Sequence, residues 1–147
     1  FYSSKDDSLF ARMKKAHFEG KLYREQQFIA GLGLNEIPGG YATGLDNSLN
    51  SYEINEDYTV IQGIIDAFFY EGDDIVLVDY KTDNVKDGEE LLGRYASQMY
   101  LYALTLEKLT AAKVKDVILY STRFGEVHYP KWRNYMDEIF EALPYAW

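Results

Sequence analysis

Residues 58–82, YTVIQGIIDAFFYEGDDIVLVDYKT, hold the two clearest strand signals of the chain. Val, Ile, Phe and Tyr dominate 58–70 and 74–82, and Glu71-Gly72-Asp73-Asp74 between them is typical of a hairpin turn. A loop of two or four residues places Asp66 directly opposite Asp79, whereas a loop of odd length breaks that pair. Lys81 lies two residues beyond Asp79 and therefore on the same face.

The apolar residues around these two acids cover both faces of the hairpin, as in the interior strands of a sheet. Two facing carboxylates repel each other and are poorly solvated in such a place. A divalent cation between them would resolve the conflict, and hard oxygen ligands suit Mg²⁺ or Mn²⁺. The alternative is a structural ion-pair cluster in which Lys81 neutralises both acids, and the register alone leaves both interpretations open.

The elements around the hairpin predict one domain of α/β (α+β) class, with a central mixed sheet flanked by helices. We expect a helix over 3–19, a first strand over 22–30 and a long helix from Gly88 to about Leu109. The remaining expected elements are a strand over 114–122, a short strand over 126–129 and a helix over 131–142 within a C-terminal helical tail, 131–147. Residues 31–57, rich in Gly, Asn and Ser, are expected to form an irregular insertion.

The composition limits the possible functions. The chain has 147 residues, no cysteine and a net charge of −9, so it has neither a disulfide nor a thiolate zinc site. The negative charge counts against a broad basic surface for nucleic acid, although a bound cation can supply positive charge locally. No apolar stretch approaches the roughly 20 residues of a membrane span, so we expect a cytoplasmic protein. Because the chain begins with Phe1, we expect a fragment of a longer protein.

Three motifs carry a family resemblance. Gly63-Ile64-Ile65-Asp66 followed by Val78-Asp79-Tyr80-Lys81 resembles the signature of PD-(D/E)XK nucleases, in which an acid on one strand precedes acid-any-Lys on the next. Gln98 and Tyr102 match the Gln-x-x-x-Tyr pattern of the RecB-like branch. The segment from Arg24 to Phe28 resembles the Arg-Glu-x-x-Phe strand of the AddA subunits of bacterial AddAB helicase–nucleases. The resemblance runs from Ser8 to Tyr120 and implies a restriction-endonuclease-like core.

The resemblance implies a role for each matching residue. Asp66, Asp79 and Lys81 would be the catalytic residues, and the two aspartates would bind Mg²⁺ or Mn²⁺ together with the backbone carbonyl of Tyr80. Lys81 would orient or help to deprotonate the attacking water. Gln98, Tyr102 and Glu25 would support the site or touch DNA, although a salt bridge explains Glu25 nearly as well.

The function implied is metal-dependent exonuclease cleavage of DNA in double-strand-break repair. A helicase N-terminal to Phe1 would feed a single strand from a duplex end, and an AddB-like subunit would complete the enzyme. A PD-(D/E)XK nuclease of a phage or defence system and a catalytically silent binding module are the alternatives. RecB-like nucleases often carry a further histidine ligand ahead of the first strand. The surroundings of His17 do not match that segment, which we expect to precede Phe1.

Overall fold

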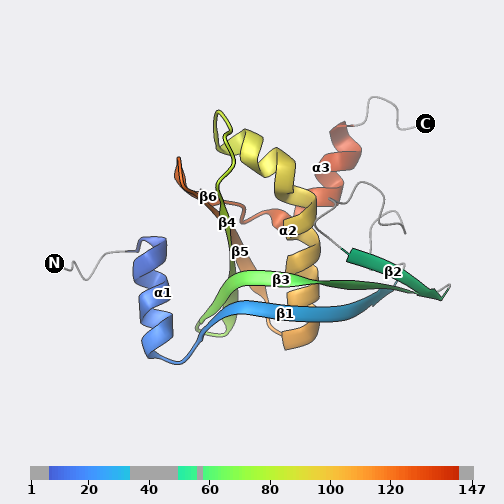
Figure 1. Cartoon of the computed structure of the whole chain (residues 1–147), viewed down its shortest axis with the longest axis horizontal. Coiled ribbons are helices and arrows are strands. Elements are labelled where there is room, and N and C mark those ends of the chain that lie inside the picture. Colours follow the sequence, from blue (N-terminus) through green and yellow to red (C-terminus); the bar gives the residue numbers. More distant parts are fainter. Residues whose placement is uncertain (1–6, 34–49, 56–57, 143–147) are drawn as a thin grey trace.

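A mixed β-sheet with helices on both faces forms the structure, which is a computed structural model that describes residues 7–33, 50–55 and 58–142 (Figure 1). The sheet follows the order β1-β3-β4-β5-β6, and β2 also pairs with β3. The strands are β1 Leu22–Gly33, β2 Asn50–Asn55, β3 Tyr58–Glu71, β4 Asp74–Lys81, β5 Val114–Ser121 and β6 Gly125–His128. The helices are α1 Leu9–Phe18, α2 Gly88–Thr110, the short 3-10 helix η2 Trp132–Asn134 and α3 Tyr135–Ala142. This α+β architecture confirms the predicted class and is compatible with a restriction-endonuclease-like core.

The hairpin of β3 and β4 has the register that the sequence predicts. Its backbone pairs run from Glu71↔Asp74 to Ala67↔Val78. The loop consists of two residues, and Gly72 adopts the left-handed region with φ 64°, which a residue without Cβ enters at no steric cost. The tight turn thus fixes the alignment of the two strands.

The strand β5 pairs with β4 in parallel, while the other paired strands are antiparallel. A parallel neighbour requires a crossover connection, and α2 supplies it. Asp87 caps the start of α2 by accepting a hydrogen bond from the Glu90 N–H at 2.9 Å. The crossover lays α2 across one face of the sheet.

Each face of the sheet has its own apolar core, and Figure 1 shows α1 and α2 on opposite sides of it. Side chains alternate along β4, so Val76 and Val78 pack against α1, whereas Ile75 and Leu77 pack on the side of α2. By the same alternation Asp79 and Lys81 lie on the α2 side, and Tyr80 lies on the α1 side, where its hydroxyl is 3.7 Å from the sulfur of Met13.

Three predicted boundaries are corrected. The first helix begins at Leu9, because Ser8 forms its N-cap and accepts a hydrogen bond from the Ala11 N–H; residues 1–6 lie outside the described ranges. The expected irregular insertion over 31–57 contains ordered strand at both ends, since β1 continues to Gly33 and β2 occupies Asn50–Asn55 against β3; residues 34–49 and 56–57 are not described. The expected helix over 131–142 begins with η2 and continues as α3.

Among the residues described, none of the helices is both long enough and apolar enough to cross a membrane.

Candidate active site

The candidate site lies where β3 changes partner. Along one edge β3 pairs with β1, and along the other it pairs first with β2, as far as Gln62, and then with β4 from Ala67 onward. Residues 63–66 therefore lie on that second edge between the two partners. Asp66 bridges the gap with its side chain, which accepts a hydrogen bond from the Tyr80 N–H at 2.9 Å. The site is thus formed at the point where β3 and β4 diverge.

The two predicted acids lie at adjacent positions of the hairpin, one step beyond the pair Ala67↔Val78. Asp79 is buried, with 7% of its surface exposed. Burial raises the pKa of Asp79 to about 6; the Lys81 ammonium opposes this rise, and the charge of Asp66 adds to it. Asp79 is therefore a carboxyl group that is costly to ionise without a further cation.

Lys81 forms a close ion pair with Asp79. The Lys81 Nζ is 2.6 Å from the buried Oδ2 of Asp79 and acts against the rise that burial causes in the pKa of that carboxyl group. The same Nζ is 3.5 Å from Oε1 of Gln98 and 3.7 Å from the centre of the Tyr95 ring. The lysine is held between the sheet and α2, with its charge directed at the site.

The helix α2 contributes the predicted pair Gln98 and Tyr102, both buried. Burial raises the pKa of Tyr102, and hydrogen bonds from the Ile64 backbone and the Gln98 side chain partly offset that rise. The Tyr102 hydroxyl approaches Gly63 so closely that a Cβ on residue 63 would lie 2.7 Å from it. Gly63 therefore permits α2 to pack against the gap in β3.

Glu25 is placed differently from the other predicted residues. The neighbouring pairs Arg24↔Ala67 and Gln26↔Ile65 place Glu25 on β1, opposite Asp66 of β3. Its side chain is exposed, and its backbone has φ 50°, a left-handed conformation that is uncommon for a residue with a Cβ. Among the described residues, no hydrogen bond or ion pair that the structure shows joins Glu25 to the two aspartates.

The structure thus brings together Asp66, Asp79, Lys81, Gln98 and Tyr102, and their catalytic and supporting roles stay predictions. The sequence did not predict the contacts of Tyr95 with Lys81 and with Asp83, whose carboxylate accepts a hydrogen bond from the Tyr95 hydroxyl at 2.8 Å. The spacing offered a signal, because Tyr95 lies one helical turn before Gln98 and faces the same side of α2.

The residues present fit a hard divalent cation. The neighbouring carboxylates of Asp79 and Asp66 provide oxygen ligands of the kind that Mg²⁺ prefers. No cluster of three or more His, Cys, Asp or Glu placed to hold a metal occurs within 7–33, 50–55 and 58–142. Mg²⁺ commonly uses one or two carboxylates and completes its shell with water and substrate phosphate, so a pair of acids suffices for it.

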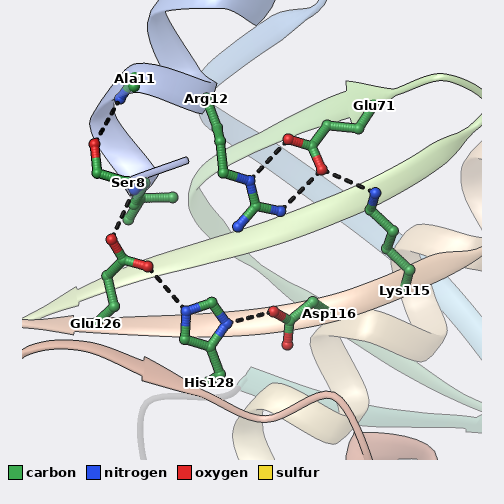
Figure 2. Close-up of polar contacts among 9 residues, drawn as sticks. Ser8, Ala11, Arg12, Glu71, Lys115, Asp116, Glu126 and His128 are labelled. Carbon is green, nitrogen blue, oxygen red and sulfur yellow. Dashed lines mark hydrogen bonds and ion pairs between the residues drawn. The ribbon is translucent and has the colours of Figure 1, made fainter. Parts of the chain in front are cut away.

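A second charged network attaches α1 to the sheet (Figure 2). Arg12 forms two hydrogen bonds with Glu71, at 2.8 and 2.9 Å, and lowers the pKa of Glu71 to about 2. On β6, Glu126 accepts from the Leu9 N–H at 2.7 Å and contacts His128 at 2.9 Å. The other ring nitrogen of His128 is 2.6 Å from Asp116. The contact between His128 and Asp116 was not predicted from the sequence, because Asp116 lies on β5, whereas Glu126 lies two residues before His128 on β6 itself.

No protein-family model matches the chain. Proteins named as the A subunit of ATP-dependent helicase/nucleases are similar to it. The protein of Lachnoclostridium phytofermentans is 36% identical over 144 residues, covering 82% of this chain and 10% of that protein. The protein of Clostridium perfringens is 42% identical over 113 residues, covering 75% of this chain and 8% of that protein. The protein of Alkaliphilus oremlandii is 38% identical over 111 residues, covering 74% of this chain and 8% of that protein.

The fold is that of an α+β domain with a mixed sheet flanked by helices, which is compatible with a restriction-endonuclease-like core. The chain belongs to the AddA family of ATP-dependent helicase/nuclease subunits, as the resemblance predicts. It spans a tenth or less of the length of the relatives described above.

Proposed function

We propose that this chain is a metal-dependent DNA exonuclease domain that hydrolyses phosphodiester bonds, with Asp66, Asp79 and Lys81 at its active centre. The observation that carries the proposal is the pairing of two carboxylates at the divergence of β3 and β4, with the Lys81 ammonium 2.6 Å from Asp79. The names of the relatives support a nuclease within a larger helicase-containing protein.

A purely structural ion-pair cluster explains these residues less well. Lys81 brings one positive charge to two neighbouring carboxylates, and burial together with the charge of Asp66 raises the pKa of Asp79 to about 6 in spite of that lysine. Buried negative charge that is not fully balanced is costly unless a further cation binds. Replacing the set by apolar side chains would remove that cost, so its presence favours a group that is satisfied only when a ligand binds.

Each of these residues would have a separate role in phosphodiester hydrolysis. Asp66 and Asp79 would hold Mg²⁺ or Mn²⁺, together with the backbone carbonyl of Tyr80. The cation, when bound, supplies Lewis-acid stabilisation of the phosphate and lowers the pKa of a coordinated water. Lys81 is placed to donate a hydrogen bond to the attacking water or to a phosphate oxygen, where negative charge develops. Gln98 restrains Lys81, and Tyr102 keeps α2 against β3.

The proposed setting is repair of DNA double-strand breaks in the cytoplasm of a bacterium. A helicase elsewhere in the full-length protein would deliver a single strand from a duplex end, and an AddB-like subunit would be the partner. Delivery by a motor would explain how a domain with a net charge of −9 reaches a polyanionic substrate.

Metal binding is the first test. Mn²⁺ and Mg²⁺ are titrated calorimetrically into the chain, into Asp66→Asn and Asp79→Asn, and into Asp73→Asn, which makes the same change in the exposed hairpin loop. We expect saturable binding by the chain and by Asp73→Asn, and its loss in the other two variants. Retention of binding by both site variants would contradict the proposed ligand set.

Cleavage is the second test. End-labelled single-stranded DNA is incubated with Mg²⁺ and either the chain or its Lys81→Met variant. We expect stepwise shortening by the chain and at least a 100-fold slower rate for Lys81→Met, about 2.7 kcal/mol of lost transition-state stabilisation. Metal binding that depends on both aspartates, without cleavage, would indicate a silent binding module instead.

A further inference from the structure

We propose that Tyr95 is a positioning residue for Lys81: its ring holds the lysine ammonium beside Asp79, and Asp83 anchors the ring through the tyrosine hydroxyl. This inference rests on the proposed function, in which Lys81 is a catalytic residue, and it names the side chains that keep Lys81 in place. The contacts of the Lys81 ammonium and of the Tyr95 hydroxyl support it.

The Lys81 ammonium has three close neighbours. Its Nζ lies 2.6 Å from Oδ2 of Asp79, 3.5 Å from Oε1 of Gln98 and 3.7 Å from the centre of the Tyr95 ring. The side chain of Lys81 is only 14% exposed, so water is largely excluded from these contacts. The attraction between a cation and the face of an aromatic ring becomes stronger when the cation is desolvated. The Tyr95 ring therefore contributes to the position of the ammonium together with the two polar partners.

A second aspartate could compete for the same lysine. Asp79 and Asp83 each lie two residues from Lys81 in the sequence. Lysine is a point charge on a flexible four-carbon chain, so its ammonium can turn towards either side. The structure places the ammonium at Asp79, where it can act on a bound phosphate or water. A group that holds it there and occupies Asp83 would therefore favour the arrangement needed for catalysis.

Asp83 is occupied by two side chains of α2. Its Oδ2 accepts a hydrogen bond from the Tyr95 hydroxyl at 2.8 Å and another from Nη1 of Arg94 at 3.0 Å. The hydrogen bond from Tyr95 contributes most to lowering the pKa of Asp83, and Arg94 and the charge of Lys81 add to this effect, which burial opposes. Asp83 is therefore ionised at neutral pH and is bound to the helix that carries Tyr95.

The two ends of the Tyr95 side chain are fixed separately. Its backbone belongs to α2, which packs on the sheet through buried residues such as Met99. Three residues separate Tyr95 from Gln98, so both side chains point to the same side of the helix, towards Lys81. Its hydroxyl is held by Asp83. A ring restrained at both ends provides a rigid surface against which the ammonium is held.

The first test detects the contact without DNA and without metal. An aromatic ring shifts nuclei that lie over its face upfield, so the ε-methylene signal of Lys81 should lie upfield of the range of solvent-exposed lysines in proton–carbon NMR spectra of the chain in EDTA. The variant Lys81→Met assigns this signal by its loss. We expect Tyr95→Leu to abolish the upfield shift. Tyr95→Phe and Asp83→Ala should reduce it to a similar extent, because they remove the same hydrogen bond from opposite ends.

The second test measures cleavage of end-labelled single-stranded DNA with Mg²⁺. We expect Tyr95→Leu to lower kcat about 10-fold or more and to change KM less than about 2-fold, because the Lys81 charge acts where negative charge develops. Tyr95→Phe keeps the ring and should lose less than about 3-fold. In the Lys81→Met background, Tyr95→Leu should change kcat by less than about 2-fold, because no ammonium remains to be positioned.

Tyr100 offers a matched control on the same helix. It is partly buried, as Tyr95 is, but its ring packs against Trp132 and Tyr135, with centroid distances of 6.0 and 5.4 Å. Tyr100→Leu makes the same change of side chain at a different face of α2. We expect it to leave the Lys81 signal in place and to change kcat by less than about 2-fold. Circular dichroism and thermal melts verify that each variant is folded at the assay temperature.

The outcomes separate the positioning role from the nuclease activity. A Lys81 signal without the upfield shift would overturn the proposal, as would a shift that Tyr95→Leu leaves unchanged. It would also be overturned by a loss of kcat that recurs in full in the Lys81→Met background or that Tyr100→Leu reproduces. If the chain cuts DNA and Tyr95→Leu cuts it equally fast, the nuclease stands and the positioning role fails. If the shift is present and Tyr95→Leu abolishes it, but the chain cuts nothing with Mg²⁺, the position of Lys81 is upheld and the proposed activity fails.

Discussion

The contact between Gly63 and α2 gives a sharp prediction for the substitution Gly63→Ala. A Cβ at this position would lie 2.7 Å from the Tyr102 hydroxyl and 3.1 Å from the Phe28 ring. Tyr102 and Phe28 are both buried, so neither ring can turn out of the way without disturbing the core. Inserting a methyl group into such a site costs about 1–3 kcal/mol.

The unfolded chain partly offsets that cost. Replacing Gly by Ala stabilises a protein by about 0.4–1 kcal/mol where the native backbone tolerates it, because the unfolded ensemble loses freedom. The net expectation for Gly63→Ala is a loss of about 1–2 kcal/mol in the free energy of unfolding, or roughly 2–8 °C in Tm for a chain of this size. Urea titration followed by circular dichroism measures this difference.

The matched control is Gly93→Ala. Gly93 lies on the exposed face of α2, and a Cβ there would meet nothing within 4 Å. Since alanine is favoured over glycine in a helix, this variant should gain about 0.5–1 kcal/mol. A Gly63→Ala variant as stable as Gly93→Ala would refute the packing argument.

A double-mutant cycle identifies the atom responsible. Tyr102→Phe alone removes the hydroxyl and its hydrogen bonds, at a cost of about 1 kcal/mol. In the Gly63→Ala background, Tyr102→Phe also removes the close contact between the hydroxyl and the added methyl group. The loss of unfolding free energy in the double variant should therefore be about 1 kcal/mol smaller than the sum of the losses in the two single variants. Strict additivity would show that the Tyr102 hydroxyl is not the atom that collides with the added methyl group.

Three further predictions concern the attachment of α1 and the C-terminal segment. The pKa of Glu71 is about 2, lowered from its usual 4.5 chiefly by the hydrogen bond from Arg12, so its contribution is present above pH 4.5 and is lost as the pH falls towards 2. Arg12→Gln should therefore cost about 1–2 kcal/mol at pH 7, screened by solvent, and little at pH 2, in urea titrations at both values. Burial tends to lower the pKa of His128, but Asp116 and Glu126 raise it overall, so its stabilisation is complete below pH 6.5 and is lost as the pH rises through the native pKa. In the His128→Gln variant, the Tm should no longer fall as the pH rises through this range. If the dependence of Tm on pH were the same as in the unmodified chain, His128 would not stabilise the fold through Asp116 and Glu126. Trp132 is 1% exposed and its Nε1 donates to the Val114 carbonyl at 3.0 Å, so Trp132→Ala should cost about 3–5 kcal/mol by urea titration, whereas a loss below 1 kcal/mol would show that the segment does not anchor the fold.

The sequence predicted the hairpin and its register because both depend on local information. A two-residue loop with glycine and the alternation of side chains fix which residues face each other. The long helix over Gly88–Thr110 was equally accessible, because its apolar face and its cap at Asp87 lie within one segment. The position of Lys81 beside Asp79 follows from the same alternation.

Features that depend on distant partners were not accessible from the sequence. The segment Asn50–Asn55 has an ordinary composition and is a strand because β3 offers it a free edge. The contact between His128 of β6 and Asp116 of β5 depends on the pairing of these two strands, which residue spacing does not predict. The first helix was predicted to begin at residue 3, but the side chain of Ser8 caps it so that it begins at Leu9.

By itself, then, the sequence determined the fold class, the facing aspartates and the family, because a tight turn and a strong strand period leave few alternatives. Only the tertiary structure decided three features. The strand β3 pairs with β2 before Asp66 and with β4 after it, α2 packs against Gly63, and the cationic helix α1 lines a groove beside Tyr80. These three features arise from pairing and packing between segments far apart in the chain. Their free energies depend on which surfaces meet, and local residue patterns do not encode that.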